Sequence, residues 1–176
     1  MTFRLTRDRI KIYGAGKTWA SPRLRELRNH GFHLVSRWID APQCLTSPDD
    51  NHSPETHENE SLKGYLWNLC KEDTKRCDLM LWLCSPEDGE MQSGALVELG
   101  HVTMLDKPVY IIGTCASVEP VGHSDRAWKS QPNVYHWPHI KDALEGAKLA
   151  IAHYQKNYRD FWFERHGMPG LTKKAA

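Results

Sequence analysis

The sequence predicts an α/β fold in which helices cover both faces of a parallel sheet. Strand-like and helix-like segments alternate along the 176 residues, an order typical of parallel strands joined by helices. The runs over residues 79–84 and 109–113 are continuously apolar, as strands buried on both faces are. A chain of this length can bury one core. We therefore expect a single domain over residues 1–160, followed by a C-terminal tail over residues 161–176.

The first expected elements are a strand, a helix and a second strand. Residues 10–13 are rich in β-formers and predict the first strand. Ser21 and Pro22 predict the start of a helix, because Ser suits the N-cap and Pro suits the first turn. That helix ends near Gly31, and residues 32–38 predict the second strand.

The remaining elements follow a polar segment over residues 40–60, which has no periodicity and predicts a long loop. Apolar residues at helical spacing predict a helix over residues 62–76. A helix over residues 93–105 separates the two apolar strands. A weaker strand over residues 133–137 and a long helix over residues 140–158 complete the alternation.

Composition and patterning argue against several classes of protein. Lys and Arg number 23 and Asp and Glu 22, so no basic surface for nucleic acid is indicated. No apolar run approaches the about 20 residues that span a bilayer, and residues 1–12 lack the apolar core of a signal peptide. The five cysteines without a secretion signal predict reduced thiols. A cytoplasmic location is the default expectation.

Histidines and cysteines do not form a recognisable metal site. The ten histidines pair loosely, without acids or cysteines at metal-ligand spacing. Cys70, Cys77 and Cys84 recur every seven residues, whereas zinc sites usually need closer pairs. We interpret them as core thiols and expect neither a metal nor a Cys-His nucleophile pair.

The turn Gly14-Ala15-Gly16-Lys17-Thr18 follows the first expected strand, and ligands bind beyond the carboxyl ends of parallel strands. A P-loop would need Gly where Lys11 stands, and a dinucleotide fingerprint would need Gly where Trp19 stands. The failed fingerprint counts against a nucleotide-dependent oxidoreductase and leaves no cofactor indicated. A small-residue turn remains, which lets a ligand approach the backbone; a simple packing turn is the alternative.

Glu98 is the principal candidate catalytic residue. It lies near the start of a helix that directly follows a buried strand and a turn. Gly100 weakens that helix by roughly 1 kcal/mol relative to Ala, so we expect close packing there, with Leu96, Val97 and Leu105 facing the sheet. From position alone, a solvated Glu favoured by the helix dipole explains residue 98 equally well.

Three further polar or aromatic residues adjoin expected strands. Asp78 precedes the central strand, where it orients a ligand or, the reading that sequence alone favours, caps the preceding helix end. Arg37 and Trp38 end the second expected strand, and together they suit a charged or flat ligand. An amphipathic strand end explains them as well.

The segment Gly94-Ala95-Leu96-Val97-Glu98-Leu99-Gly100-His101, with Lys107-Pro108-Val109-Tyr110 after it, resembles the nucleophile helix and following strand of the nucleoside 2-deoxyribosyltransferase family. Three other segments are similar to family segments: the first strand and binding turn at residues 12–16, a subgroup motif at 36–40, and the entry to the next strand at 77–81. The resemblance covers roughly residues 9–150. It implies a flavodoxin-like, Rossmann-like five-stranded parallel sheet.

The resemblance implies an enzyme that cleaves or exchanges the N-glycosidic bond of a nucleoside or nucleoside monophosphate, releasing free base. Glu98 is the implied nucleophile at the anomeric carbon, and a second acid should assist the leaving base. Relatives hydrolyse nucleoside 5'-monophosphates, and a nucleotide-binding sensor without chemistry is a further alternative. Many members have Asp where this chain has Cys70, and Asp or Ser where it has Gln92.

The candidate site residues therefore fall into two groups. Asp78 and Asp88 join Glu98 as catalytic candidates, Asp88 because it lies on the same loop as Gln92. The candidates for substrate binding are Tyr13, Gly14, Ala15, Gly16, Lys17, Arg37, Trp38, Gln92, Ser93 and Gly94.

The chain is expected to form a homodimer or a higher homo-oligomer, with neither nucleic acid nor membrane as a partner. The reason is the aromatic segment Phe161-Trp162-Phe163, which a monomer would find hard to bury. The family resemblance implies the same.

Overall fold

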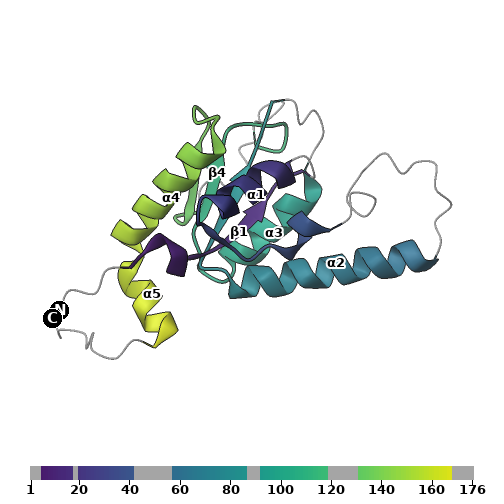
Figure 1. Ribbon diagram of the computed structural model, residues 1–176, viewed down its shortest axis with the longest axis horizontal. Coiled ribbons are helices and arrows are strands. Elements are labelled where there is room, and N and C mark those ends of the chain that lie inside the picture. Colours follow the sequence, from purple (N-terminus) through teal and green to yellow (C-terminus); the bar gives the residue numbers. More distant parts are fainter. Residues whose placement is uncertain (1–4, 18–19, 42–56, 87–91, 119–130, 168–176) are drawn as a thin grey trace.

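A computed structural model of the chain describes residues 5–17, 20–41, 57–86, 92–118 and 131–167. Five strands form one sheet in the order β2-β1-β3-β4-β5, and every neighbouring pair is parallel (Figure 1). The strands are β1 (Lys11–Ala15), β2 (His33–Leu34), β3 (Leu79–Leu83), β4 (Val109–Ile112) and β5 (Val134–Trp137). The expected parallel α/β sheet is confirmed.

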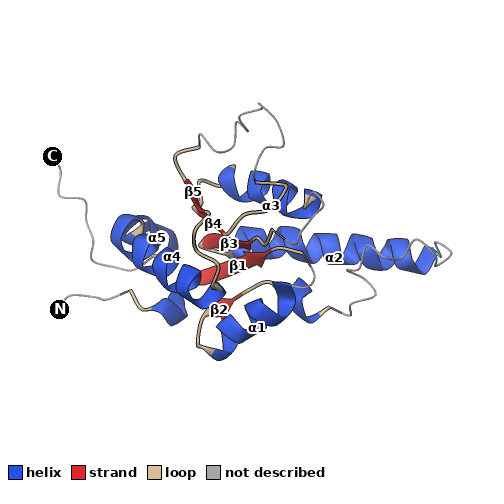
Figure 2. Ribbon diagram, turned by 90° about the horizontal axis from the view of Figure 1, so that it is seen from above, coloured by secondary structure: helices blue, strands red, loops and turns tan. Residues whose placement is uncertain are grey.

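Helices cover both faces of this sheet (Figure 2). Gly14 of β1 faces Leu24 of α1 (Ser21–Asn29), and Ile112 of β4 faces Gly146 of α4 (Ala143–Asn157). Tyr13 points the opposite way, as alternate strand residues do, toward the layer formed by α2 (His57–Arg76) and α3 (Ser93–Thr103). None of the helices in the described ranges is both long enough and apolar enough to cross a membrane.

The second strand is shorter than expected. Its pairing with β1 ends at Leu34, and a 3-10 turn, η3, covers Arg37–Asp40. The hydroxyl of Ser36 accepts a hydrogen bond of 2.6 Å from the amide of Gly14, and the indole of Trp38 donates one of 2.8 Å to the Gly14 carbonyl. On the β2 side of Gly14, side chains thus take the place of backbone pairing between strands. The prediction of a strand over residues 32–38 was therefore wrong beyond residue 34.

Helix boundaries also differ from the sequence prediction. α1 begins at Ser21 as expected, but Ala20 is its N-cap and no side chain caps it. α4 begins at Ala143 because the Asp142 carboxylate accepts a 2.7 Å hydrogen bond from the amide of Glu145. α2 begins at His57, inside the segment expected to be a loop.

α3 packs on the sheet through a different face from the one expected. The buried residues are Ala95, Leu99 and Val102, which recur at the i, i+4, i+7 spacing of one helix face. Val97 is 54% exposed and Leu105 is 38% exposed. The expectation that these two residues face the sheet was therefore wrong.

Two of the three residues of the C-terminal aromatic segment are buried within the chain, and Phe161 is partly buried. The segment belongs to α5 (Arg159–His166), in which Trp162 and Phe163 are 6% and 5% exposed. Burial inside one chain removes the aromatic segment as a reason to expect an oligomer. The expected boundary between residues 160 and 161 falls inside α5.

Candidate active site

A hydrogen bond between β1 and α3 defines the candidate site. The hydroxyl of Tyr13 donates to Oε1 of Glu98 over 2.6 Å. Tyr13 is fully buried in β1, and Glu98 is partly exposed in the second turn of α3. The sheet therefore holds one carboxylate oxygen in a fixed position while the residue keeps access to solvent.

Cys70 of α2 completes this cluster. Its thiol also hydrogen-bonds Glu98, and the residue is 6% exposed. Sequence reasoning interpreted Cys70 as a core thiol and omitted it from the site. The comparison with the family, which places Asp at this position, was the signal that could have identified it.

The electrostatics of the cluster make Glu98 the group that titrates near neutrality. Burial raises the pKa of Glu98 to about 7, although the hydrogen bonds from Tyr13 and Cys70 act to lower it. Burial, followed by the charge of Glu98, raises the pKa of Tyr13 well above its usual 10 and that of Cys70 to about 12. Both neighbours therefore stay protonated and act as donors.

A cavity of about 150 Å³ opens between α2 and α3 beside Glu98. Its lining consists of Trp67, Cys70, Lys71, Thr74, Val97, Glu98 and His101. Among these lining residues Glu98 is the single carboxylate. His101 lies 2.7 Å from the Thr74 hydroxyl through Nδ1, and burial with the neighbouring lysines lowers its pKa. The cavity is thus an apolar groove with one ionisable acid.

A larger cavity, of about 800 Å³, lies between β5 and α4. Trp137, His139 and His153 are among its lining residues, and it includes none of the predicted site residues. Size alone therefore does not identify the candidate site, whereas the pKa and the hydrogen bonds of Glu98 do.

Close packing explains why residues 14 and 16 are glycines. A Cβ on Gly14 would lie 2.6 Å from Cδ2 of Leu24. Gly16 has φ of 152°, and a Cβ there would lie 2.9 Å from the carbonyl oxygen of Leu83. Ala15 is buried, and the Lys17 carbonyl accepts from the amide of Ala20. Substrate binding at this turn stays a prediction.

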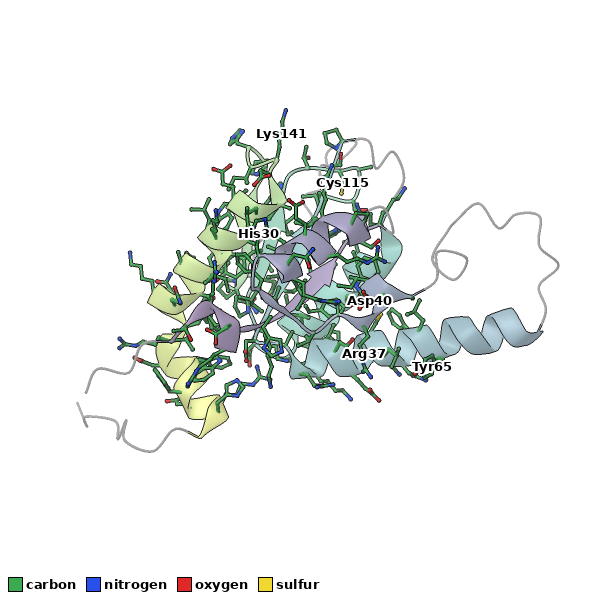
Figure 3. All side chains as sticks on the ribbon, in the orientation of Figure 1. His30, Arg37, Asp40, Tyr65, Cys115 and Lys141 are labelled. Carbon is green, nitrogen blue, oxygen red and sulfur yellow. The ribbon has the colours of Figure 1, made fainter. Side chains whose placement is uncertain are left out.

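Arg37 and Trp38 tie η3 to its neighbours. Arg37 Nε lies 2.9 Å from Asp73 Oδ1, and Nη2 lies 2.7 Å from Glu72 Oε2, beside α2 (Figure 3). Trp38 is 8% exposed and bonded to Gly14. The structure does not bring either side chain to Glu98. They hold the layer of α2 against β1 instead.

Asp78 occupies a different place from the Glu98 cluster. It lies at the amino end of β3, and its Oδ2 accepts from the Lys11 amide at 2.8 Å and from the Trp162 indole at 3.2 Å. His166 Nε2 lies 2.8 Å from Oδ1. Asp78 thus binds α5 to the sheet and is not brought to Glu98. Asp88 lies outside the described residues.

The start of α3 is hydrogen-bonded to β3 and to the segment that follows β4. The side-chain oxygen of the buried Gln92 accepts a 2.7 Å hydrogen bond from the Trp82 indole, and the backbone N–H of Gln92 donates to the Ser117 hydroxyl. Ser93 is the first residue of α3, but its side chain lies outside the description. Gly94 is exposed. Gln92 therefore fixes the helix that positions Glu98.

The strand order and the helices on both faces define an α/β protein of the flavodoxin-like, Rossmann-like class. No family model matches the chain, and no curated protein matches it. Among solved structures, the chain is similar to the CMP N-glycosidase BcmB of Clostridium botulinum. The TM-score is 0.45 and the identity 17%, over 80% of this chain and 98% of that chain.

Proposed function

We propose that this protein is an enzyme that breaks the N-glycosidic bond of a nucleoside or nucleotide, with Glu98 as its nucleophile. The observation that supports this most directly is the 2.6 Å hydrogen bond that orients Glu98 from Tyr13. The pKa of about 7 gives a carboxylate that is both ionisable at neutrality and more nucleophilic than an ordinary Glu. The sequence around residue 98 resembles a family that uses Glu in this role.

The reaction proceeds in two displacements. An ionised Glu98 oxygen attacks the anomeric carbon, the C1'–N bond breaks, and its electron pair leaves with the base, which takes up a proton. Water, or the nitrogen of an acceptor base, then attacks the same carbon and releases Glu98 as carboxylate. Two inversions retain the configuration of the sugar.

The apolar groove favours the first displacement. Burial disfavours the charged form of Glu98, as its raised pKa records. Formation of a neutral ester removes that buried charge, while the Tyr13 hydroxyl stays in place beside it. A groove of about 150 Å³ is smaller than the about 300–1,000 Å³ typical of whole-ligand pockets, so it suits the sugar, and the base lies outside it.

The acid that assists the leaving base must be a group other than Glu98. Asp78 is occupied at the amino end of β3, and Glu98 is the single carboxylate among the groove residues. Asp88, which precedes α3 in the sequence, is the remaining sequence candidate. We assign this role to Asp88. The variant Asp88→Asn tests it, because base release should fall more for bases that leave poorly.

The reaction is tested by incubation with ribo- and deoxynucleosides and their 5'-monophosphates, with and without an acceptor base. Free base is followed by chromatography, and new nucleoside distinguishes transfer from hydrolysis. Glu98→Gln should lose at least about a thousandfold in base release, with the exposed Glu164→Gln as matched control. Mass spectrometry of the quenched wild-type protein should show a sugar adduct. Full activity in Glu98→Gln would contradict the proposal.

A second candidate function is nucleotide binding without turnover. It is favoured by Cys70, a thiol of pKa about 12 beside Glu98, where the resembling family has a carboxylic acid. Calorimetry that shows tight binding of a monophosphate, with no base released from any substrate, would support this function over catalysis.

A further inference from the structure

His101 lies about one helical turn beyond Glu98 on α3, and both residues line the groove of about 150 Å³ between α2 and α3. Residues three apart on a helix are neighbours, with about 5–6 Å between their Cβ atoms. In enzymes that retain the configuration of a sugar, the nucleophile and the group that exchanges protons are only about 5–5.5 Å apart. The spacing of His101 from Glu98 therefore suits a residue that acts at the same sugar carbon.

Thr74 of α2 holds the His101 ring in one orientation. Its hydroxyl oxygen lies 2.9 Å from the Lys71 carbonyl oxygen and 2.7 Å from Nδ1 of His101. A hydroxyl has one hydrogen, and a carbonyl can only accept, so Thr74 donates to Lys71 and accepts from Nδ1–H of His101. The hydrogen of the neutral imidazole is then on Nδ1, and the lone pair of Nε2 is available. No other group among the described residues hydrogen-bonds this ring.

The surroundings of His101 keep its ring neutral at neutral pH. Burial lowers its pKa, and the charges of Lys75, Lys107 and Lys71 lower it further. His101 can therefore take a proton from water, but it cannot supply one to a leaving base. Cys70, the thiol beside the nucleophile, has a pKa of about 12 and stays protonated. His101 is thus suited to act as a base in this groove, whereas Cys70 is not.

We propose that His101 is the base that takes a proton from the attacking water, and that the second displacement at this site is hydrolysis. This inference rests on the proposed role of Glu98 as nucleophile. The water oxygen bonds to the anomeric carbon while the ester bond from that carbon to Glu98 breaks, and its electron pair returns to the carboxylate. The proton of the water passes to Nε2 of His101, which then releases it to solvent. An acceptor base would instead lose its proton along the path by which the first base left, to Asp88.

The first test is the rate of each displacement in His101→Gln, measured with the nucleoside or 5'-monophosphate that the wild-type protein turns over fastest. The first-turnover burst of free base should stay within about twofold of wild type, whereas steady-state hydrolysis should fall at least about a hundredfold. The sugar adduct on Glu98 should therefore accumulate, which mass spectrometry of the quenched protein measures. His30→Gln, at the exposed end of α1, is the matched control and should keep the wild-type rates.

The choice of acceptor gives a second readout, which a merely structural role of His101 would not change. Azide attacks carbon without losing a proton, so it should restore the turnover of His101→Gln and give a glycosyl azide of retained configuration. With an added acceptor base, the ratio of new nucleoside to free sugar should rise at least about tenfold over wild type. Wild-type hydrolysis in His101→Gln, or a slow variant that azide does not rescue, would overturn the role of His101 and leave that of Glu98 intact. A wild-type protein that releases no base would overturn both.

Thr74 variants and the wild-type protein itself provide the test if His101→Gln fails to fold. Thr74→Val removes the oxygen that orients the ring, so hydrolysis should fall about tenfold, the equivalent of one hydrogen bond, and Thr74→Ser should restore it. Nitrogen-15 NMR of wild-type protein labelled at histidine reads the tautomer without any substrate. The spectrum should show the hydrogen of His101 on Nδ1, and a hydrogen on Nε2 would overturn the proposal.

Discussion

The Tyr13 hydroxyl donates to the Glu98 carboxylate across 85 residues of sequence, and this contact joins the central part of the sheet to the groove between α2 and α3. Tyr13 is buried and stays protonated, so it serves only as a donor. Glu98 is the member of the pair whose charge changes near neutrality.

Removal of the Tyr13 hydroxyl should shift the pH dependence of base release. The hydrogen bond lowers the pKa of Glu98, so Tyr13→Phe should raise that pKa, by about one unit if the bond to the charged form is worth about 1.5 kcal/mol. Activity requires the carboxylate, so it should fall about tenfold below the midpoint and recover as the pH rises. The pH profile of kcat/KM measures the shift.

A matched control for this variant is Tyr135→Phe, which removes a hydroxyl bonded to Tyr158 at 2.7 Å, away from Glu98. Its pH midpoint should equal that of the wild-type protein. A Tyr13→Phe profile that is lowered uniformly at every pH would show that the hydroxyl acts on substrate and not on the ionisation of Glu98.

Glu98→Gln should make the protein more stable at alkaline pH. The pKa of Glu98 is about 7 in the folded protein against its usual 4.5. A raised folded pKa contributes stability that is complete below about pH 4.5 and is lost as the pH rises through about 7. The loss is at most about 3 kcal/mol, and Gln, which is neutral, does not suffer it. Denaturant unfolding at about pH 5 and pH 8 measures both proteins.

The exposed Glu164→Gln is the control for this difference and should follow the wild-type pH dependence. Parallel stability curves for the wild-type protein and Glu98→Gln would mean that the Glu98 carboxylate is solvated in the folded state. Such a result would remove the electrostatic argument for its nucleophilicity.

The elements that the sequence predicted well are those whose signal is local. Burial is visible in the residues of these elements themselves. Examples are the apolar runs that form β3 and β4 and the periodic segment that ends at Arg76. β2 was overextended because its end depends on Ser36 and Trp38 bonding to Gly14, more than twenty residues earlier in the chain. Periodicity contains no information about such side-chain bonds.

The candidate site shows the same limit. Glu98 was identified from its place after a buried strand and from the resemblance around it, but its partners come from β1 and α2. Cys70 looked like any core thiol until α2 was packed against α3. The aromatic residues of α5 looked unburiable because the surface that receives them is formed by distant segments, including Asp78.

Asp78→Ala should reduce stability and leave the chemistry intact. The substitution removes an acceptor shared by the Lys11 amide, the Trp162 indole and His166. The buried Trp162 indole and the part-buried Lys11 amide, left unsatisfied, should cost about 3 kcal/mol together, seen as a lower thermal midpoint. Below that midpoint, kcat/KM should stay within about twofold of wild type. A folded Asp78→Ala protein with a collapsed kcat would restore the catalytic role considered for this residue.

Gly113→Ala should destabilise the fold at the carboxyl end of β4. Gly113 has φ of 80°, and a Cβ there would lie 2.5 Å from the carbonyl oxygen of Cys84. Positive φ costs a non-glycine residue about 1–2 kcal/mol, and the clash adds to it because a strand backbone cannot move aside without breaking the β3–β4 ladder. The free energy of unfolding should fall by about 3 kcal/mol or more.

Gly167→Ala separates the backbone strain of a positive φ from the steric clash. Gly167 follows α5 with φ of 65°, and a Cβ there would meet nothing within 4 Å, so its substitution should cost only the about 1–2 kcal/mol of backbone strain. Denaturant unfolding of both variants gives the difference directly. Equal losses would mean that the Cys84 carbonyl yields to the methyl group, and that β3 and β4 are less tightly held at this edge than their burial implies.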